Sequence, residues 1–126
     1  MTAEVQVPFT FSVISGADSS IRSSRQKAFT RSLNLVGFVF DTQAMEYDGL
    51  HISFTEGSYA RNMLEISLDL GKGFADLELL GQVEWYERRS TAVGDTYIAG
   101  VSFIDMTADV MGVMREFLQR AQLASR

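Results

Sequence analysis

The chain has 126 residues, a net charge of −5 and no cysteine. This length suits one domain over residues 1–126, and 46% hydrophobic residues is typical of a folded protein. The lack of cysteine excludes disulfides, thiolate metal sites and cysteine nucleophiles, and it favours a cytoplasmic location. Because an acidic surface repels polyanions, we expect no DNA or RNA binding. No stretch approaches the roughly 20 apolar residues of a membrane helix, so we expect no membrane insertion.

The first third of the chain shows the two-residue hydrophobic period of β-strands. Residues 5–13 alternate between apolar side chains and polar or small ones, and they end at the turn-like stretch SGADSS. Residues 32–40, SLNLVGFVF, are apolar on both faces around Gly37. This pattern predicts a second strand with a bulge or a close backbone approach at the glycine.

Four further segments show the same alternation. They are residues 49–54, with Leu50, Ile52 and Phe54 on one face, residues 62–70, residues 75–87 and residues 95–106. In residues 75–87 the alternation places Trp85 in the core beside Val83. The stretch RRSTAVGD before the last segment predicts a hairpin loop. Together the segments predict six strands within about residues 4–104.

From Thr107 the hydrophobic period becomes helical, which predicts a helix over about residues 107–123. Thr107 is the expected N-cap, and Asp109 lies where the helix dipole favours an acid. Six short strands without crossover helices must be antiparallel, and closing them into a barrel removes exposed edges. We therefore expect an all-β fold, a six-stranded antiparallel β-barrel with a C-terminal α-helix that covers a barrel mouth or contacts a partner.

Residue types that carry catalysis or bind metals form no convincing group. His51 is the only histidine and alternates with apolar neighbours, which favours a structural or surface role. The acids of the predicted strands occupy polar positions, where a solvated face explains them. The stretch GKGFAD lacks the length and the trailing hydroxyl of a P-loop. We therefore expect a non-enzymatic protein with no catalytic residue, metal site or cofactor.

Positive charge is concentrated in the segment that leads into the second predicted strand. Arg22, Arg25, Lys27 and Arg31 fall within ten positions, without an acid between residues 18 and 41. Such a cluster can bind one small anion. The alternative is a solvated loop whose charges keep a strand edge from pairing.

Four stretches occur in the order of a known group of bacterial domains. They are QVPFTFSV, SLNLVG, LLGQVEWYE and YIAGVSFIDM, the last followed by the predicted helix. The order resembles the PilZ domain, with its first strand after Val-Pro, its (Asp/Asn)-x-Ser-x-x-Gly motif, its Gly-x-Val-x-Trp strand and its Gly-Val-x-Phe strand and tail. The resemblance covers nearly the whole chain. It implies a non-enzymatic bacterial signalling domain.

The resemblance also implies a ligand, cyclic di-GMP. In the family an Arg-x-x-x-Arg motif before the first strand supplies cations for phosphate and donors for guanine, and the second motif lets the backbone approach a guanine. Here Thr2 and Gln6 stand at the two arginine positions. The nearby basic segment then offers replacement cations. The candidate ligand-binding residues are Arg22, Arg25, Arg31, Ser32, Asn34 and Gly37.

Three functions are consistent with these observations. The first is a cyclic di-GMP receptor that regulates a downstream partner. The second is a divergent PilZ-like adaptor that does not bind cyclic di-GMP and docks a protein, possible contact residues being Met111, Met114 and Phe117 of the predicted helix. The third is a small barrel that binds single-stranded nucleic acid on exposed aromatic side chains, which the acidic charge disfavours.

Overall fold

The computed structural model describes residues 2–54 and 60–124. Its strands are β1 (Thr2–Ala3), β2 (Pro8–Ile14), β3 (Gln26–Asn34), β4 (Gly37–Thr42), β5 (Glu46–Tyr47), β6 (Leu50–His51), β7 (Met63–Leu68), β8 (Leu77–Thr91) and β9 (Gly94–Ile104). Helix α1 (Ala108–Ala124) follows β9. Within the described ranges, no helix combines the length and hydrophobicity needed to cross a membrane.

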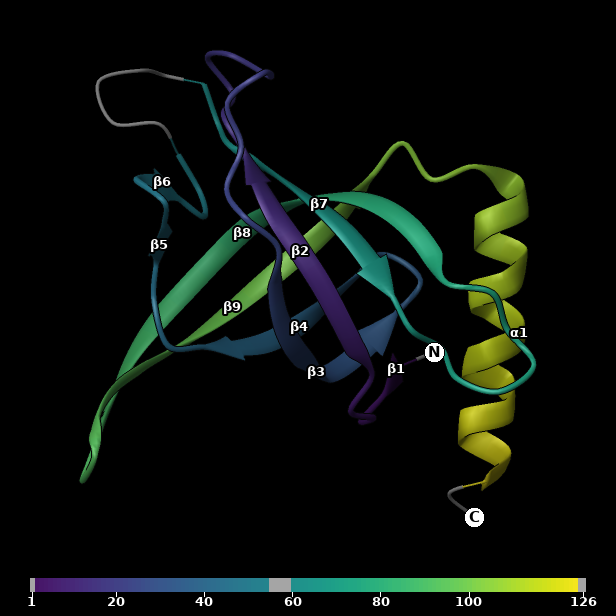
Figure 1. The fold of residues 1–126 in the computed structure, drawn as a ribbon. Helices are drawn as coiled ribbons and strands as arrows, with labels where there is room; N and C mark the ends of the chain where they lie inside the picture. The colour runs from purple at the N-terminus through teal and green to yellow at the C-terminus, as the bar shows by residue number, and fades with distance from the viewer. Residues whose placement is uncertain (1, 55–59, 125–126) are drawn as a thin grey trace.

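Six of the strands close into an antiparallel barrel (Figure 1). Strands β3, β2, β7, β8, β9 and β4 are hydrogen-bonded in that order, and the pairing of β3 with β4 completes the ring. The short β1 pairs with β3 outside the ring, and β5 and β6 form a separate two-stranded sheet. The predicted six-stranded barrel with a C-terminal helix is therefore confirmed.

The alternating side chains of the strands fill the barrel with one hydrophobic core. Four phenylalanines from β2 and β4 pack against one another with ring centroids 4.9–5.9 Å apart: Phe9, Phe11, Phe38 and Phe40. Leu64, Ile66 and Leu68 of β7 are completely buried beside them. Tilted and edge-to-face aromatic packing adds to the free energy gained from burial, so this cluster anchors the two strands that flank β3.

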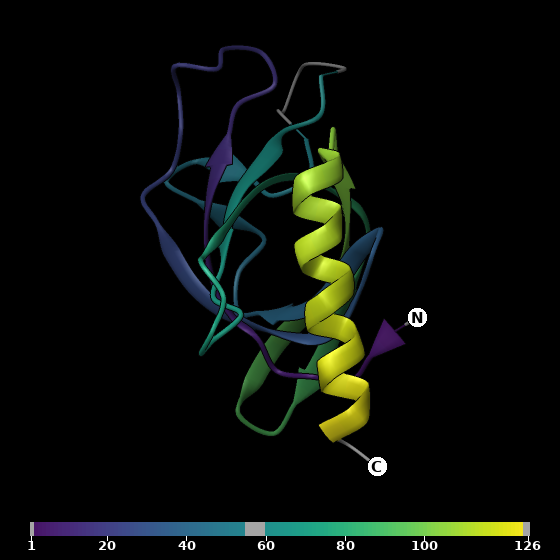
Figure 2. The same ribbon diagram turned by 90° about the vertical axis from the view of Figure 1, so that its right-hand side faces the viewer.

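Helix α1 crosses one end of the barrel (Figure 2). The hydroxyl of Thr107 accepts a hydrogen bond from the backbone N–H of Val110 at 3.2 Å, which confirms Thr107 as the N-cap. Met114 is completely buried and Phe117 is 9% exposed, packing at 5.7 Å against Phe74. The helix therefore covers a barrel mouth.

This packing corrects the expectation that the methionine-bearing helix face docks a partner. Met114 and Phe117 belong to the core of this chain, and Met111 is half-buried. A partner could reach the two core side chains only by removing the helix from the barrel. The apolar stripe is explained by intramolecular burial.

The segment 32–40 is a hairpin and not the single strand that was predicted. The side-chain oxygen of Asn34 accepts hydrogen bonds from the backbone N–H groups of Val36 at 2.8 Å and Gly37 at 3.0 Å, which turns the chain between β3 and β4. A Cβ on Gly37 would lie 1.9 Å from the carbonyl oxygen of Val101, so the predicted close backbone approach is confirmed. The bulge lies elsewhere, between Thr30 and Ser32 of β3.

The predicted strand over residues 49–54 is also shorter than expected. Only Leu50 and His51 form β6, Ile52 is buried, and Phe54 is 44% exposed. The preceding turn uses two residues with positive φ, Asp48 and Gly49, and the chain then leaves the strand direction. The three apolar side chains therefore do not share one buried face.

Strands β8 and β9 form a longer hairpin than predicted (Figure 1). The stretch RRSTAVGD is almost entirely strand, because pairing continues to Thr91 opposite Gly94 and leaves a turn at residues 92–93. The pair extends away from the barrel as a two-stranded ribbon. A register shift between Val83 and Trp85 marks a β-bulge at the point where this ribbon leaves the barrel wall.

Candidate ligand-binding site

The three residues of the predicted second motif lie together. Ser32, Asn34 and Gly37 line a small hollow of about 180 Å³ on the outer face of the barrel, which we call the motif hollow. Its other lining residues are Val36, Phe38, Val39, Glu84, Trp85, Gly100, Val101 and Ser102. The hollow thus joins the β3–β4 turn to the bulged part of β8 and to β9.

The bulge in β8 places an indole, that of Trp85, and a carboxylate, that of Glu84, in the motif hollow. Val83 pairs with Val101 and Trp85 pairs with Gly100, so Glu84 is the additional residue. The insertion shifts the register against β9, and every residue of β8 after Val83 is exposed. The expectation that Trp85 is in the core is therefore wrong: its side chain is 46% exposed. Glu84 and Trp85 consequently line the same hollow instead of facing opposite sides of the strand.

Glu84 is held in its ionised form. Its Oε1 accepts a hydrogen bond from the Ser102 hydroxyl at 2.6 Å, and its Oε2 lies 3.5 Å from Nη2 of Arg61. The Ser102 hydrogen bond, aided by the Arg61 charge, lowers the pKa of Glu84 below its ordinary value. The motif hollow therefore contains a carboxylate at neutral pH, and none of the described residues that line it is basic.

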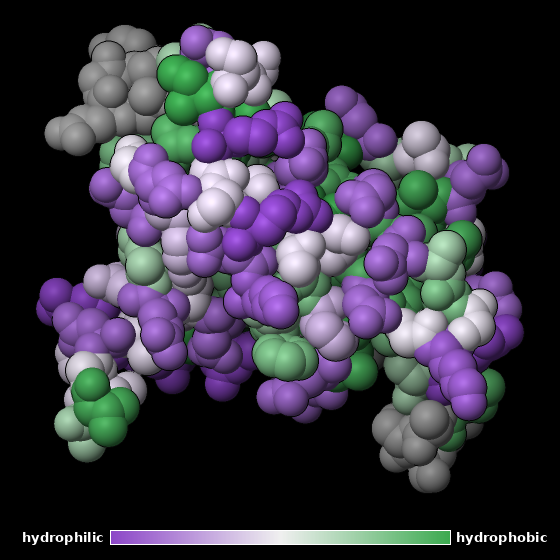
Figure 3. Space-filling view, viewed as in Figure 1, coloured by the Kyte–Doolittle hydropathy of each residue, from purple (hydrophilic) through white to green (hydrophobic). Residues whose placement is uncertain are grey.

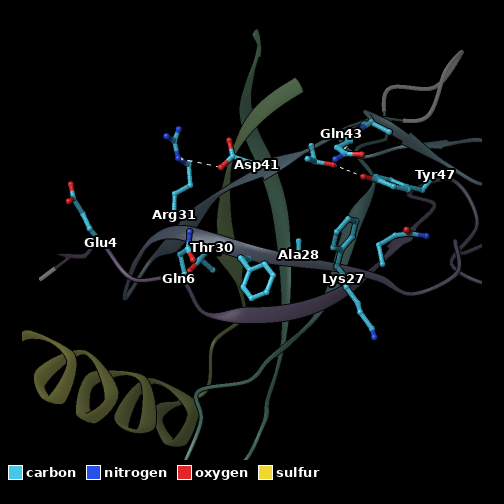
Figure 4. A pocket seen from close by; sticks show the side chains of 14 residues that line it. Glu4, Gln6, Lys27, Ala28, Thr30, Arg31, Asp41, Gln43 and Tyr47 are labelled. Carbon is cyan, nitrogen blue, oxygen red and sulfur yellow. Dashed lines mark hydrogen bonds and ion pairs between the residues drawn. The ribbon is translucent and has the colours of Figure 1, made fainter. Parts of the chain in front are cut away.

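The two positions where the family has arginines flank this region. The backbone of Thr2 pairs with that of Asn34, so the N-terminal segment runs beside the motif. Gln6 is exposed and lines a second, larger hollow of about 980 Å³ next to β3, which we call the lateral hollow (Figure 4). Arginines at these positions would add two cations here, but Thr2 and Gln6 are neutral.

Arg31 is the predicted cation that comes nearest to the motif. Arg31 is the additional residue of the β3 bulge. Together with Ser32 it separates the buried residues Thr30 and Leu33. Its side chain lines the lateral hollow, where Nε lies 3.4 Å from Oδ2 of Asp41 (Figure 4). The side chains of both partners are about half exposed, so the pair is solvated and weak.

Arg22 and Arg25 lie at the other end of β3. Each has its Nη1 3.2 Å from Oε1 of Glu65, and Nη2 of Arg25 donates to the Thr10 hydroxyl at 2.9 Å. These contacts with Thr10 of β2 and Glu65 of β7 place the two arginines over β2 and β7. The face over these strands is largely hydrophilic (Figure 3). From Arg25 to Asn34 the chain covers roughly 30 Å of strand. The structure therefore does not bring these two arginines to Ser32, Asn34 and Gly37.

His51 lies outside both hollows. Its Nδ1 accepts a hydrogen bond from the backbone N–H of Ser53 at 3.0 Å, and its ring packs 4.3 Å from Phe54 and 5.6 Å from Tyr86. Burial lowers the pKa of His51, and the charge of Glu46 opposes this effect. The expected structural role of the histidine fits these contacts.

Sequence reasoning missed Glu84, Trp85 and Ser102 as members of the candidate site. The only signal in the sequence is the aromatic pair in EWYE, which could form a stacking platform, but alternation predicts Trp85 in the core. A bulge of one residue has no signature in that alternation. Its effect becomes visible only in the register of β8 against β9.

Comparison with known proteins supports the fold. No family model matches the sequence, and no curated protein matches it significantly. The PilZ domain of YcgR from Escherichia coli, solved with c-di-GMP, has a TM-score of 0.66 and 12% identity, covering 100% of this chain and 92% of that one.

Two longer proteins are similar over part of their length. The inhibitor of motility MotI/DgrA from Bacillus subtilis has a TM-score of 0.62 and 12% identity over 99% of this chain. PlzA from Borreliella burgdorferi, solved in complex with c-di-GMP, has a TM-score of 0.54 and 10% identity over 99% of it. This chain covers 50% and 52% of these two chains. The chain therefore has the PilZ-like fold that its sequence motifs predicted.

Proposed function

We propose that this chain is a non-enzymatic signalling domain of bacterial cyclic di-GMP pathways that acts in the cytoplasm by binding a protein partner. We further propose that it does not hold cyclic di-GMP in the motif hollow. The PilZ-like fold supports the first statement. The observation that carries the second is the charge of the motif hollow, which contains the Glu84 carboxylate and no basic side chain among its described lining residues.

The argument against nucleotide binding is electrostatic. Cyclic di-GMP carries two phosphates, and each charge-assisted hydrogen bond to such a group contributes about 1.5–3 kcal/mol. Neutral residues at positions 2 and 6 remove two of these contacts, which lowers affinity by roughly two to four powers of ten. The Glu84 carboxylate lines the same hollow, and the neighbouring Arg61 is already paired with it, so this pair offers no unpaired cation to a phosphate.

One observation favours a second candidate, a cyclic di-GMP receptor that regulates a partner. The β3 bulge sets Arg31 next to Ser32, and the phosphate of a ligand could displace Asp41 from its exposed ion pair. This candidate uses Arg31, Ser32, Asn34 and Gly37. It leaves out Arg22 and Arg25, because Glu65 engages both at the far end of β3.

Calorimetric titration of cyclic di-GMP into the chain at physiological salt separates the two candidates. We expect no saturable heat with the wild type at protein concentrations of about 100 µM, because the affinity loss argued above leaves binding too weak to detect at this concentration. The double variant Thr2→Arg/Gln6→Arg should gain binding. A control that adds the same charge elsewhere, Gln119→Arg/Ala92→Arg, should not, since both positions are exposed and outside the hollows.

Micromolar binding by the wild type would overturn our proposal in favour of the receptor. In that case Arg31→Ala should abolish the heat, whereas the double variant Arg22→Ala/Arg25→Ala should retain it. The reverse pattern would show that the ligand binds over β2 and β7, away from both hollows.

A further inference from the structure

We propose that the motif hollow accepts an arginine side chain of the partner protein, with its guanidinium placed on the indole of Trp85 and against the carboxylate of Glu84. This inference rests on the proposed function and identifies the contact through which the partner binds. It assigns to the motif hollow a cation in place of an anion.

The first support is the adjacency of an exposed aromatic face and a carboxylate. The bulge brings Glu84 and Trp85 into one hollow, and the indole lies so close to Gly100 that a Cβ there would be 2.1 Å from Nε1. A guanidinium stacks on an aromatic ring and donates in a fork to a carboxylate. One guanidinium can therefore contact both groups at once.

The second support is that Glu84 retains acceptor capacity. Ser102 donates to Oε1, and Arg61 lies 3.5 Å from Oε2 while also donating to the backbone carbonyl of Val83. An ionised carboxylate has about four acceptor positions, so these two partners leave room for an incoming donor. The Glu84 side chain is 46% exposed, and it is therefore accessible from the hollow.

The third support concerns the rim and the size of the hollow. Val36 is 71% exposed at the tip of the β3–β4 turn, and Val39 also lines the hollow. A volume of about 180 Å³ admits one side chain and not a dinucleotide. The segment that fits presents an arginine next to an apolar residue, and the net charge of −5 attracts such a basic partner.

Trp85 is the only tryptophan, so its fluorescence reports on the motif hollow without a label. The probe is the peptide acetyl-Gly-Val-Arg-Gly-amide, and the matched control replaces its arginine by citrulline, which has a similar shape without the charge. We expect a saturable fluorescence change with the arginine peptide. The citrulline peptide should bind about fivefold more weakly or not at all.

Variants separate this contact from general charge attraction. Glu84→Gln should weaken the arginine peptide about fivefold. Glu87→Gln removes the same charge from an exposed position on the same strand, outside the motif hollow, and should leave the affinity unchanged. No fluorescence change at millimolar peptide, equal response to citrulline, or equal effects of the two variants would each overturn the inference.

The sign of the Glu84→Gln effect also distinguishes this inference from the proposed function. Introduced into Thr2→Arg/Gln6→Arg, it should tighten cyclic di-GMP and still weaken the peptide. If the peptide does not bind and the wild type does not bind cyclic di-GMP, only this inference fails. If the wild type binds cyclic di-GMP and not the peptide, the proposed function fails as well.

Discussion

The indole of Trp85 lies directly over the backbone of Gly100, where an added Cβ would be 2.1 Å from Nε1. Gly37 makes a similar approach to a different kind of neighbour, since its Cβ would be 1.9 Å from the carbonyl oxygen of Val101. The two glycines thus differ in what must move to admit a methyl group. A half-exposed indole can turn outward, whereas a carbonyl within a paired strand cannot.

This difference predicts unequal costs for two chemically identical substitutions. Gly100→Ala should lower the free energy of unfolding by roughly 1 kcal/mol and shift the Trp85 emission to longer wavelength, because the ring moves into water. Gly37→Ala should cost roughly 3 kcal/mol and leave the emission nearly unchanged. Urea titration followed by fluorescence measures both quantities. Equal costs would show that the indole is as firmly held as the backbone.

The hydrophobic alternation of β7 and β8 shows where sequence reasoning succeeds and where it fails. Alternation in residues 62–70 identified the buried face of β7, since hydrophobic burial imposes the period directly. Alternation placed Trp85 in the core because the bulge at Glu84 adds one residue without changing the composition of the strand. The period matches the burial of β8 up to Val83, and all of the strand beyond Val83 is exposed.

The basic segment illustrates a second physical limit. Closeness in sequence suggested that Arg22, Arg25 and Arg31 surround the motif together. In an extended strand a few residues span a long distance, so the first two reach Glu65 on β7. Arg31 is next to Ser32 in β3, but its side chain pairs with Asp41 on the lateral hollow. A charge count gives the number of cations but not the acids that neutralise them.

The side chain of Asn34 should stabilise the β3–β4 turn independently of any ligand. Because its oxygen accepts from the N–H groups of Val36 and Gly37, Asn34→Ala leaves two turn donors without this partner and should cost about 1–3 kcal/mol. Asn34→Asp keeps the acceptor and should remain within about 1 kcal/mol of the wild type. Chemical denaturation compares the two variants. Equal losses would mean that the turn is held by the sheet alone.

Shortening single side chains of helix α1 should test its role as the cover of the barrel. Met114→Ala removes a completely buried side chain and should cost about 2–5 kcal/mol. Leu123→Ala removes an apolar side chain that is 66% exposed on the same helix, and its effect should stay below about 0.5 kcal/mol. Thermal unfolding measures both. A stable Met114→Ala variant would restore the possibility that this helix face serves a partner.

The single histidine makes a clean prediction about pH. Burial lowers the pKa of His51 below 6.5, and the Ser53 N–H that donates to Nδ1 requires the neutral ring. The folded chain therefore binds fewer protons than the unfolded chain as the pH falls below 6.5. The stabilisation from the neutral ring is fully present above that pH and is lost as the pH falls through the lowered value in the folded chain.

Proton NMR of the only imidazole tests this directly, because its Cε1–H resonance needs no assignment among other histidines. We expect a midpoint below 6.5 and a free energy of unfolding that decreases from pH 7 to about pH 5.5. His51→Phe keeps a ring beside Phe54 and should remove that dependence. A midpoint above 6.5 would mean that the attraction of Glu46 outweighs burial, and stability would then increase on acidification through this range.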